Sequence, residues 1–374
     1  MLLKEITTYL DKLFKKDLAF SWDNCGLLIG DLSKEITRIL IALDVDFSAV
    51  RQAKDKRADL IISHHPLIFN PLKRLTSESV NEKIIMDVIK NDIAVYSAHT
   101  NMDAADFGIG SRILKELGLK QTGYLEPAGR RRYKFVVFVP ADFEEKIRQA
   151  MCEAGGGTWK DYSCCTFGTE GKGTFRPGSS SSPFIGEKGM LSEVEEIRME
   201  CIVNGENLEK LSNSVIKAHP YEEPAYDIYA LENRFPEGGI GQTAEFDVSV
   251  SAADFLKSVK EKLGLKNLRF VFSKPADDVK IKKVLLINGS ADSVVENMLD
   301  FDFDALLCGE ISYHNCAAVF EKGILVAEIG HAESEVVFTD MAWEIIDGFI
   351  RENKLDIVLY KGEKPINLWR YFIE

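Results

Sequence analysis

Short apolar runs alternate with longer segments of helical period in the first third of the chain. Segment 79–92 carries apolar residues at helical spacing, and so does segment 1–14, which mixes them with charges and lacks the apolar core of a secretory signal. Short buried strands that alternate with helices predict an α/β sheet with parallel neighbours. The runs of strand length are 37–44, 58–63 and 93–99.

The same alternation returns from residue 236 to the end of the chain. A shift of 245 positions aligns apolar runs of the first part with runs of the last, and a shift of 232 aligns His99-x3-Asp103 with His331-x3-Glu335. We infer a pseudo-repeat, in which two α/β halves form one domain. The predicted strands of the second half are 281–289, 303–310 and 324–331.

The middle of the chain has a different pattern. Strand-like and helix-like segments follow one another there in the order β-α-β-β-α-β, which is typical of a ferredoxin-like domain. The sequence therefore predicts an α+β domain at 126–235, inserted between the halves 1–125 and 236–374 of the outer α/β domain. Its predicted strands are 132–140, 163–175, 197–203 and 225–231, and its helices are 142–155 and 207–218.

Length, composition and charge narrow the function classes. A chain of 374 residues is long enough for two or three domains, and no run approaches the roughly 18 apolar residues of a membrane span. The net charge of −13 disfavours nucleic acid and anionic lipid as partners. We interpret the basic run Arg130, Arg131 and Arg132 beside Lys134 as a solvated linker. Seven cysteines without a CxxC pair do not predict a disulfide framework, so we expect a cytoplasmic protein.

Five of the six histidines lie at predicted strand ends or helix starts of the outer halves. Ligands of open α/β sheets bind beyond the carboxyl ends of the strands, so these side chains are candidate ligands. Histidine with carboxylates, rather than thiolates, suits Zn, Fe, Mn, Co or Ni. The five histidines are His64, His65, His99, His314 and His331, and the residues expected at the carboxyl ends of strands are His64, His65, His99, Glu310 and His331.

The adjacent pair His64 and His65 poses a geometric question. Neighbouring residues of a strand point to opposite faces, so both rings reach one site only if the strand ends there, unless each serves a different ion. Pro66 favours such an exit, because proline cannot donate to a strand ladder. The alternative is a structural role.

Pairs spaced by four residues supply further candidates. Gly330 precedes a predicted long helix that runs through residues 336–350. His331 and Glu335 can share a face of this helix, although a glutamate in a first turn is also favoured by the helix dipole. Glu310 and His314 repeat the spacing at the start of another predicted helix, where a cap and a surface histidine are the alternative. Asp103 and Glu335 can each bridge ions, and the imidazoles fill the remaining positions. This inventory suffices for two metals roughly 3.5 to 4 Å apart, which can activate a bridging water.

Three other segments carry polar groups that we interpret as structural. Asp23 and Asn24 stand in a turn before an apolar strand. The glycine-rich segment 238–243 has no following helix and makes a poor phosphate loop. His219 begins a stretch shaped by Pro220 and Pro224, which favours a turn over a metal ligand.

Five motifs occur in order along the chain: SWDNCGLLIGD, ISHHP, SAHTNMD, CGEISYH and IGHAESE. With them the chain resembles the Nif-three-like family, also described as GTP cyclohydrolase I type 2 homologues, in its long variant with an inserted PII/CutA-like domain. The resemblance implies a homohexameric toroid and a dinuclear metal centre with His99 close by. Two residues depart from the family pattern. Ser21 stands where an acidic residue is common, and Glu310 stands where Asp is common. The ligands that the resemblance implies are His64, His65, Asp103, His331 and Glu335.

Two functions are compatible with these features. The first is a metal-dependent hydrolase that acts on a nucleotide or a phosphoester, with His99, Glu310 or His314 as proton-transfer groups. The second is a non-catalytic metal-dependent scaffold, a metal-handling protein or a regulatory partner of another protein, in which the inserted domain is the sensing module.

Overall fold

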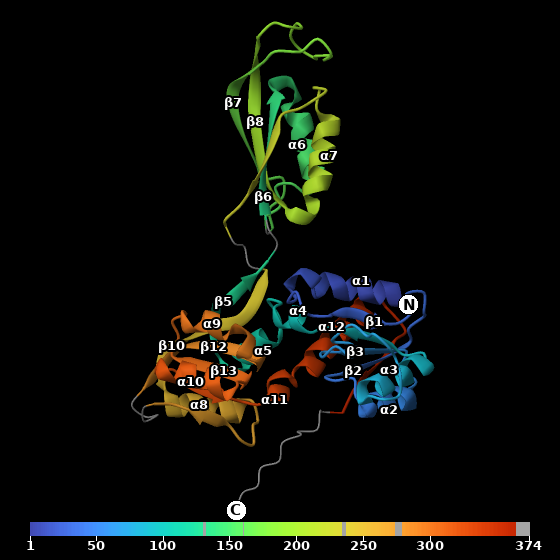
Figure 1. Ribbon diagram of the computed structural model, residues 1–374, viewed down its shortest axis with the longest axis vertical. Helices are drawn as coiled ribbons and strands as arrows, with labels where there is room; N and C mark the ends of the chain where they lie inside the picture. Colours follow the sequence, from blue (N-terminus) through green and yellow to red (C-terminus); the bar gives the residue numbers. More distant parts are fainter. Residues whose placement is uncertain (130–131, 160, 234–236, 274–278, 364–374) are drawn as a thin grey trace, which may run out of the picture. The chain divides into compact units, whose positions relative to one another are not determined.

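The computed structural model describes residues 1–129, 132–159, 161–233, 237–273 and 279–363, so Arg130 and Arg131 of the basic run lie outside the described residues. The chain forms two compact units (Figure 1). The first combines Met1–Ala128 with Pro236–Glu374, and the second is Gly129–Phe235. In the described ranges, no helix combines the length and the apolar character needed to cross a membrane.

The first sheet of the first unit has the strand order β1-β4-β3-β2-β15. Strands β4, β3, β2 and β15 are parallel to one another, and the edge strand β1 is antiparallel to β4. Buried side chains of α1 and α12 share a core with one face, and those of α2 and α3 share a core with the other. The elements are α1 (Leu3–Leu13), β1 (Gly26–Ile29), β2 (Arg38–Ala42), α2 (Phe47–Lys56), β3 (Leu60–Ser63), α3 (Val80–Lys90), β4 (Ala94–Ser97), α4 (Thr100–Asp103), α12 (Phe338–Glu352) and β15 (Val358–Lys361).

The second sheet has the strand order β11-β14-β13-β12-β10-β5. Strands β12, β13 and β14 are parallel, and the other pairs are antiparallel. Helices α5 and α8 contribute to the core on one face, and α9 and α10 to the core on the other. The elements are α5 (Ile109–Leu117), β5 (Lys120–Ala128), β10 (Gly238–Ser251), α8 (Ala252–Lys262), β11 (Arg269–Val271), β12 (Lys280–Ser290), α9 (Val295–Leu299), β13 (Ala305–Glu310), α10 (Tyr313–Glu321), β14 (Leu325–Glu328) and α11 (His331–Glu335).

One hydrophobic core joins the two sheets. It contains Ile39 and Leu60 from the first sheet, and Leu286 and Leu307 from the second, all at most 1% exposed. Each such side chain contributes roughly 1.5 to 3 kcal/mol by leaving water. Because this core is shared, residues more than 200 positions apart are held in one framework.

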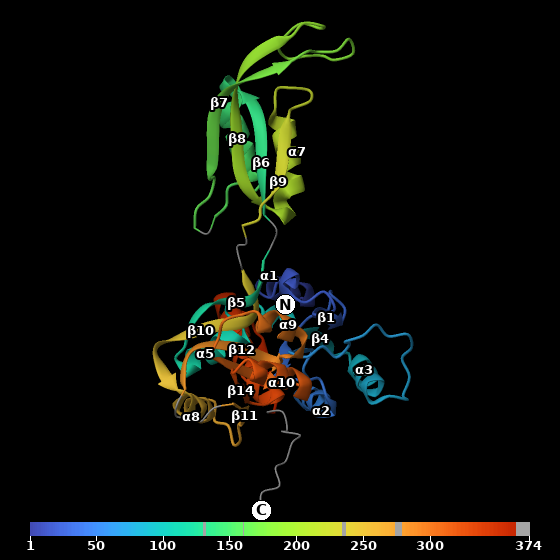
Figure 2. The same ribbon diagram turned by 60° about the vertical axis from the view of Figure 1, so that its left-hand side comes forward.

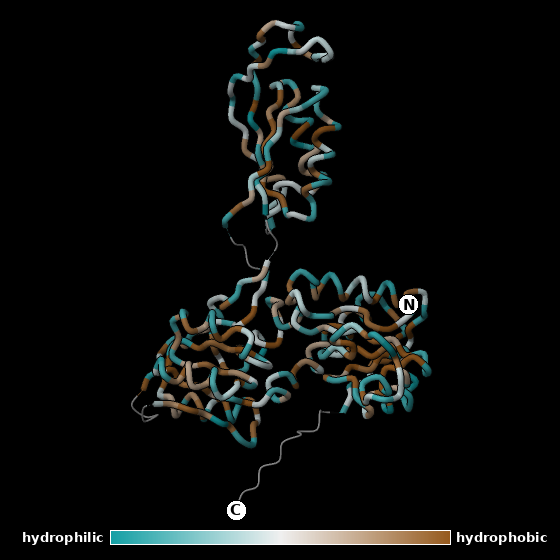
Figure 3. Tube along the Cα trace, viewed as in Figure 1, coloured by the Kyte–Doolittle hydropathy of each residue, from teal (hydrophilic) through white to brown (hydrophobic). Residues whose placement is uncertain are grey.

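The second unit is a four-stranded antiparallel sheet in the order β7-β8-β6-β9. Helices α6 and α7 lie on the same face of this sheet (Figure 1), and β7, β8, β6 and β9 lie side by side (Figure 2). Apolar residues at every second position of β6 and β8 face them, so the unit has a hydrophobic core of its own (Figure 3). The elements are β6 (Arg132–Pro140), α6 (Glu144–Glu153), β7 (Thr166–Phe175), β8 (Ser192–Asn204), α7 (Leu208–Ala218) and β9 (Tyr226–Ala230).

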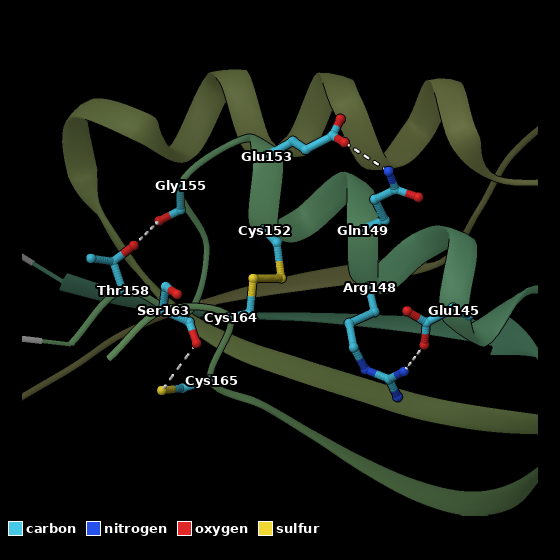
Figure 4. Close-up of a disulfide and its surroundings, with 10 residues drawn as sticks. All are labelled: Glu145, Arg148, Gln149, Cys152, Glu153, Gly155, Thr158, Ser163, Cys164 and Cys165. Atoms are coloured by element: carbon cyan, nitrogen blue, oxygen red, sulfur yellow. Dashed lines mark hydrogen bonds and ion pairs between the residues drawn. A yellow bond between two sulfur atoms is a disulfide. The ribbon is translucent and has the colours of Figure 1, made fainter. Parts of the chain in front are cut away.

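One disulfide departs from the expectation of reduced cysteines. Cys152, near the end of α6, is bonded to Cys164, with the Cα atoms 5.0 Å apart (Figure 4). The chain returns on itself between them, where Gly155 and Gly157 adopt positive φ angles of 91° and 69°. The bond therefore closes a local loop of the second unit and does not belong to a network of disulfides that holds the whole fold together. The free cysteines are Cys25, Cys165, Cys201, Cys308 and Cys316.

Candidate metal centre

The histidine pair follows β3 directly. Strand β3 ends at Ser63, and the backbone N–H groups of His64 and His65 both donate to the carbonyl oxygen of Leu43, at 3.1 Å each. The chain has thus left the strand where the pair begins, as the sequence required for two neighbouring rings to face one centre. Their ring centroids lie 5.0 Å apart.

Glu335 lies between the histidines and is only 2% exposed. Its Oε2 atom lies 3.0 Å from His65 Nε2 and 3.4 Å from His331 Nε2, while its Oε1 atom lies 3.6 Å from His64 Nε2. The predicted long helix after Gly330 is in fact two helices, α11 and α12. The short helix α11 brings His331 and Glu335 together at its two ends.

Asp103 enters from the end of α4 and is held by two amides of the second half. Asn288 Nδ2 donates to its Oδ1 at 2.7 Å, and the buried Gln242 Nε2 donates to its backbone oxygen at 3.1 Å. The Asp103 Oδ1 atom lies 3.6 Å from His64 Nε2. The carboxylate is thereby aimed at the same centre as Glu335.

All four imidazoles of the centre have an oxygen partner for Nδ1. This partner is the Ala98 carbonyl oxygen for His64 and the Asp44 carboxylate for His65, at 2.8 and 2.7 Å. A ring that donates through Nδ1 keeps Nε2 as the ligand atom. The remaining two contacts are His99 with Asp23 Oδ1, at 2.8 Å, and His331 with Glu310 Oε1, at 3.0 Å.

These side chains form three groups whose ligand atoms lie within 4.8 Å of one another. Glu335 belongs to two of the groups. His64 Nε2 and Glu335 Oε2 are buried without a hydrogen-bond partner, a costly arrangement that a cation would relieve. The residues therefore fit a metal site. The groups are His64 with His65 and His99, His65 with His331 and Glu335, and His64 with Asp103 and Glu335.

The electrostatics of the cluster favour positive charge. Burial lowers the pKa of His65, but the carboxylates of Asp44 and Glu335 raise it further, to about 10. The nearby Glu335 carboxylate raises the pKa of His331 to about 9, against the opposing effect of burial. Burial raises the pKa of Glu335, yet His64 and the other imidazoles hold it well below its ordinary value. The centre thus stabilises cations on its imidazole side.

Two candidate residues, Glu310 and His314, do not share the helix face that their spacing suggested. Glu310 ends strand β13 and does not lie in a helix, so its spacing of four residues from His314 gives the two no common helix face. Glu310 instead contacts His331 Nδ1. His314 is exposed on α10, beside the Tyr313 ring, and belongs to none of the three groups found among the described residues.

Sequence reasoning missed the partners that orient the imidazoles. Asp23 does make the expected turn contact, from Asn24 N to its Oδ1. The same carboxylate also accepts hydrogen bonds from the backbone N–H and the hydroxyl of Thr100, besides contacting His99. Asp44 could have been identified from the sequence as a partner of a histidine, because it is a polar residue at the carboxyl end of the predicted strand 37–44.

The two other segments that were interpreted as structural also have definite places. Residues 238–243 lie in strand β10. His219 is buried in the second unit, where its Nε2 lies 3.0 Å from the Phe138 carbonyl oxygen and its Nδ1 accepts from Tyr221 N–H. Both ring nitrogens are thus occupied by backbone groups.

Comparison with known proteins places the chain in a family. The model of the family described as Duf34/NIF3 (NGG1p interacting factor 3) matches residues 1–365. The chain belongs to the Duf34/NIF3 family. Two NIF3 relatives carry the name GTP cyclohydrolase 1 type 2 homolog. The Halalkalibacterium halodurans protein is 36% identical over 342 residues, 91% of each chain, and the Bacillus subtilis protein is 33% identical over 365 residues, 97% of each chain.

Solved structures of the NIF3 family share the fold. A Bacillus cereus protein related to NIF3 matches with a TM-score of 0.80 and 34% identity, covering 100% of this chain and 99% of that one. A Staphylococcus aureus protein matches with a TM-score of 0.83 and 27% identity over the same shares. The mixed α/β architecture with several sheets is therefore that of the family.

Proposed function

We propose that this NIF3 family protein is a dinuclear metal-dependent hydrolase that acts on a nucleotide or a phosphoester. The observation that carries the proposal is the position of Glu335, a buried carboxylate common to two ligand groups. Its Oε2 faces His65 and His331, and its Oε1 faces His64. A carboxylate that presents its two oxygens to different ligand groups is suited to bridge two ions.

The donor set limits the choice of metal. Imidazole nitrogens with carboxylate oxygens suit Zn, Fe, Mn, Co or Ni as divalent ions. In this assignment His65, His331 and Glu335 would hold one ion, and His64, Asp103 and Glu335 would hold the other. Two such ions, when bound, supply Lewis-acid polarisation of the substrate and lower the pKa of water.

His99 is the residue we assign to proton transfer. Its Nδ1 is engaged by Asp23, and its ring centroid lies 5.2 Å from that of His64 and 5.6 Å from that of His65. Its Nε2 is thus left for the reacting groups, where a positioned imidazole can accept or return a proton. Glu310 acts by orienting His331, and His314 is left with at most a contact to substrate at the surface.

The hydrolase proposal is tested by loading the protein with each metal and assaying GTP and a panel of phosphoesters. We expect turnover by the wild type and loss of at least about a hundredfold in Glu335→Ala and His99→Ala. His219→Gln, in the other unit, is the matched control and should retain full activity. Equal turnover by wild type and Glu335→Ala for every substrate would exclude the hydrolase.

A regulatory or scaffolding role is the second candidate, because the second unit has a core separate from that of the metal-binding unit. For this role we expect a partner protein to copurify in stoichiometric amount with the wild type. We expect its loss from a chain lacking residues 126–235 that still binds metal. Retention of the partner by the shortened chain would exclude the second unit as the interaction module.

The finer description of the architecture is also a proposal. We infer that the two sheets of the first unit are a pseudo-repeat. In each, an antiparallel edge strand is followed by three parallel strands in reverse chain order, β1-β4-β3-β2 and β11-β14-β13-β12. The strand order of the second unit, β7-β8-β6-β9, supports an inserted ferredoxin-like domain of the PII/CutA type.

We further propose that the protein is a cytoplasmic homohexamer, as its family resemblance implies. Light scattering on the purified full chain should give a mass of about six protomers at concentrations well above the dissociation constant. A protomer mass of 42.0 kDa at all concentrations would contradict the hexamer.

A further inference from the structure

The second unit contains a cavity of about 540 Å³ that the proposed hydrolase does not use. It lies between strand β7, the loop 177–185 and the segment 221–225, with Phe138 and Glu196 contributed by β6 and β8. A volume of this size suits a small organic molecule. We propose that this cavity binds an organic cation, a protonated amine carried on an aromatic or apolar skeleton, as an effector of the protein.

Aromatic rings supply the apolar part of the cavity. Tyr221 is the centre of the group, with ring centroids 6.1 Å from Phe175 and 6.3 Å from Phe184. All three rings line the cavity, as does Phe138. Rings gathered in this way can stack on a planar skeleton and attract a cation through their π faces.

Carboxylates exceed cations in the lining by four to two. Both cations already pair with glutamates that do not line the cavity, since Lys172 contacts Glu193 at 2.6 Å and Arg198 contacts Glu200. The excess negative charge disfavours phosphate and other anionic ligands, because like charges at close range repel. The four carboxylates are those of Glu170, Glu196, Glu222 and Glu223.

The Glu196 carboxylate is held in place by contacts with Tyr221 and Gly173. Its Oε1 accepts a hydrogen bond from the Tyr221 hydroxyl at 2.9 Å. Its Oε2 lies 2.0 Å from where a Cβ atom on Gly173 would stand, so only glycine at this position of β7 leaves room for it. Burial and the nearby Glu196 charge raise the pKa of Tyr221, which keeps the phenol protonated as a donor. The remaining lone pairs of Glu196 can accept from an ammonium group.

The experiment uses the full-length chain and three indole probes that differ in charge. Tryptamine is cationic, tryptophol is neutral and indole-3-acetate is anionic, and their binding is measured by isothermal titration calorimetry. We expect saturable binding of tryptamine, at least about tenfold weaker binding of tryptophol, and no binding of indole-3-acetate. Equal affinity for tryptophol or indole-3-acetate, or no saturable binding of tryptamine, would overturn the proposal.

A pair of Glu→Gln substitutions locates the binding to this cavity. Glu196→Gln keeps the side-chain shape and removes the charge, and it should weaken tryptamine binding at least about tenfold. Glu209→Gln removes the charge of an exposed residue of α7 outside the lining and should leave the affinity unchanged. Both variants are compared with the wild type by thermal unfolding, so that lost binding is separated from lost structure. Unchanged affinity in a folded Glu196→Gln variant would refute the cavity as the site.

Discussion

The carboxylate of Glu335 occupies space that a side chain on Gly289 would need. A Cβ atom on Gly289 would stand 2.6 Å from Glu335 Oε1, and the φ angle of Gly289 is +63°. At Gly289, the backbone of β12 therefore lies directly against the Glu335 carboxylate. The backbone N–H of the same glycine donates to the Ser334 hydroxyl at 2.9 Å, which ties α11 to this strand.

Substitution of Gly289 by alanine should therefore displace Glu335. We expect loss of most of the bound metal and a decrease in unfolding free energy of about 1 to 3 kcal/mol from the strained backbone. Metal per chain and urea unfolding measure the two effects. Gly348→Ala, in helix α12 with nothing within 4 Å of the added Cβ, is the control and should keep its metal. Full metal content in Gly289→Ala would contradict the close approach.

Removal of single ligands should separate the two ions. His331 belongs only to the group with His65, and Asp103 only to the group with His64, whereas Glu335 belongs to both. We expect about one ion per chain in His331→Ala and in Asp103→Ala, and close to none in Glu335→Ala, against about two in the wild type. Elemental analysis after reconstitution gives the counts. Equal metal content in all three variants would show that the ligands do not divide in this way.

Asp23 should matter for both stability and the orientation of His99. In the wild type, the Asp23 carboxylate faces His99 Nδ1 and accepts from the N–H and hydroxyl of Thr100. Asp23→Asn keeps the size of the side chain but offers these groups a neutral oxygen or an N–H₂ donor. We expect a loss of about 1 to 3 kcal/mol in unfolding free energy and a changed ring orientation of His99 in NMR spectra. Asp31→Asn, on an exposed turn, should change neither.

The first unit should fold and bind metal without the second. Strands β5 and β10 pair in register at the junction, where Ala128 lies opposite Gly238 and accepts a hydrogen bond from Glu237 N–H at 3.0 Å. A short Gly-Asn connection can therefore replace the residues between them as a hairpin turn. We expect unchanged metal content and a cooperative thermal transition of the shortened chain. An unfolded product would mean that the second unit is needed for the fold.

The disulfide should stabilise the second unit only. For the loop that Cys152 and Cys164 close, with a sequence separation of 12, the entropic contribution is about 2 to 3 kcal/mol. We expect Cys152→Ser to lower the unfolding free energy of this unit by that amount, with the metal content unchanged. Cys165→Ser, which alters a free and exposed cysteine beside the bond, should lower it by less than about 0.5 kcal/mol. Equal losses in both variants would contradict a role for the bond.

Local patterns in the sequence were enough to place most elements. The runs around Ile39, Leu60 and Ala94 became buried strands, because three to five successive apolar residues are typical of a strand in a sheet covered on both faces. Element ends were less well placed. The helix predicted from His331 onward breaks between Glu335 and Phe338. A break this short changes the spacing of apolar residues too little to be recognised in the sequence.

The sequence by itself determined the types of side chain available for metal chemistry and their places at strand ends, because strand and helix periods are local properties. Only the tertiary structure decided which partners orient them. Asp23 meets His99 across 76 positions, and Asn288 meets Asp103 across 185. Such pairs form because the core shared by the two sheets brings distant strand ends to one place, and this packing has no local signature. The same is true of the cavity beside Tyr221, whose walls come from four separate segments.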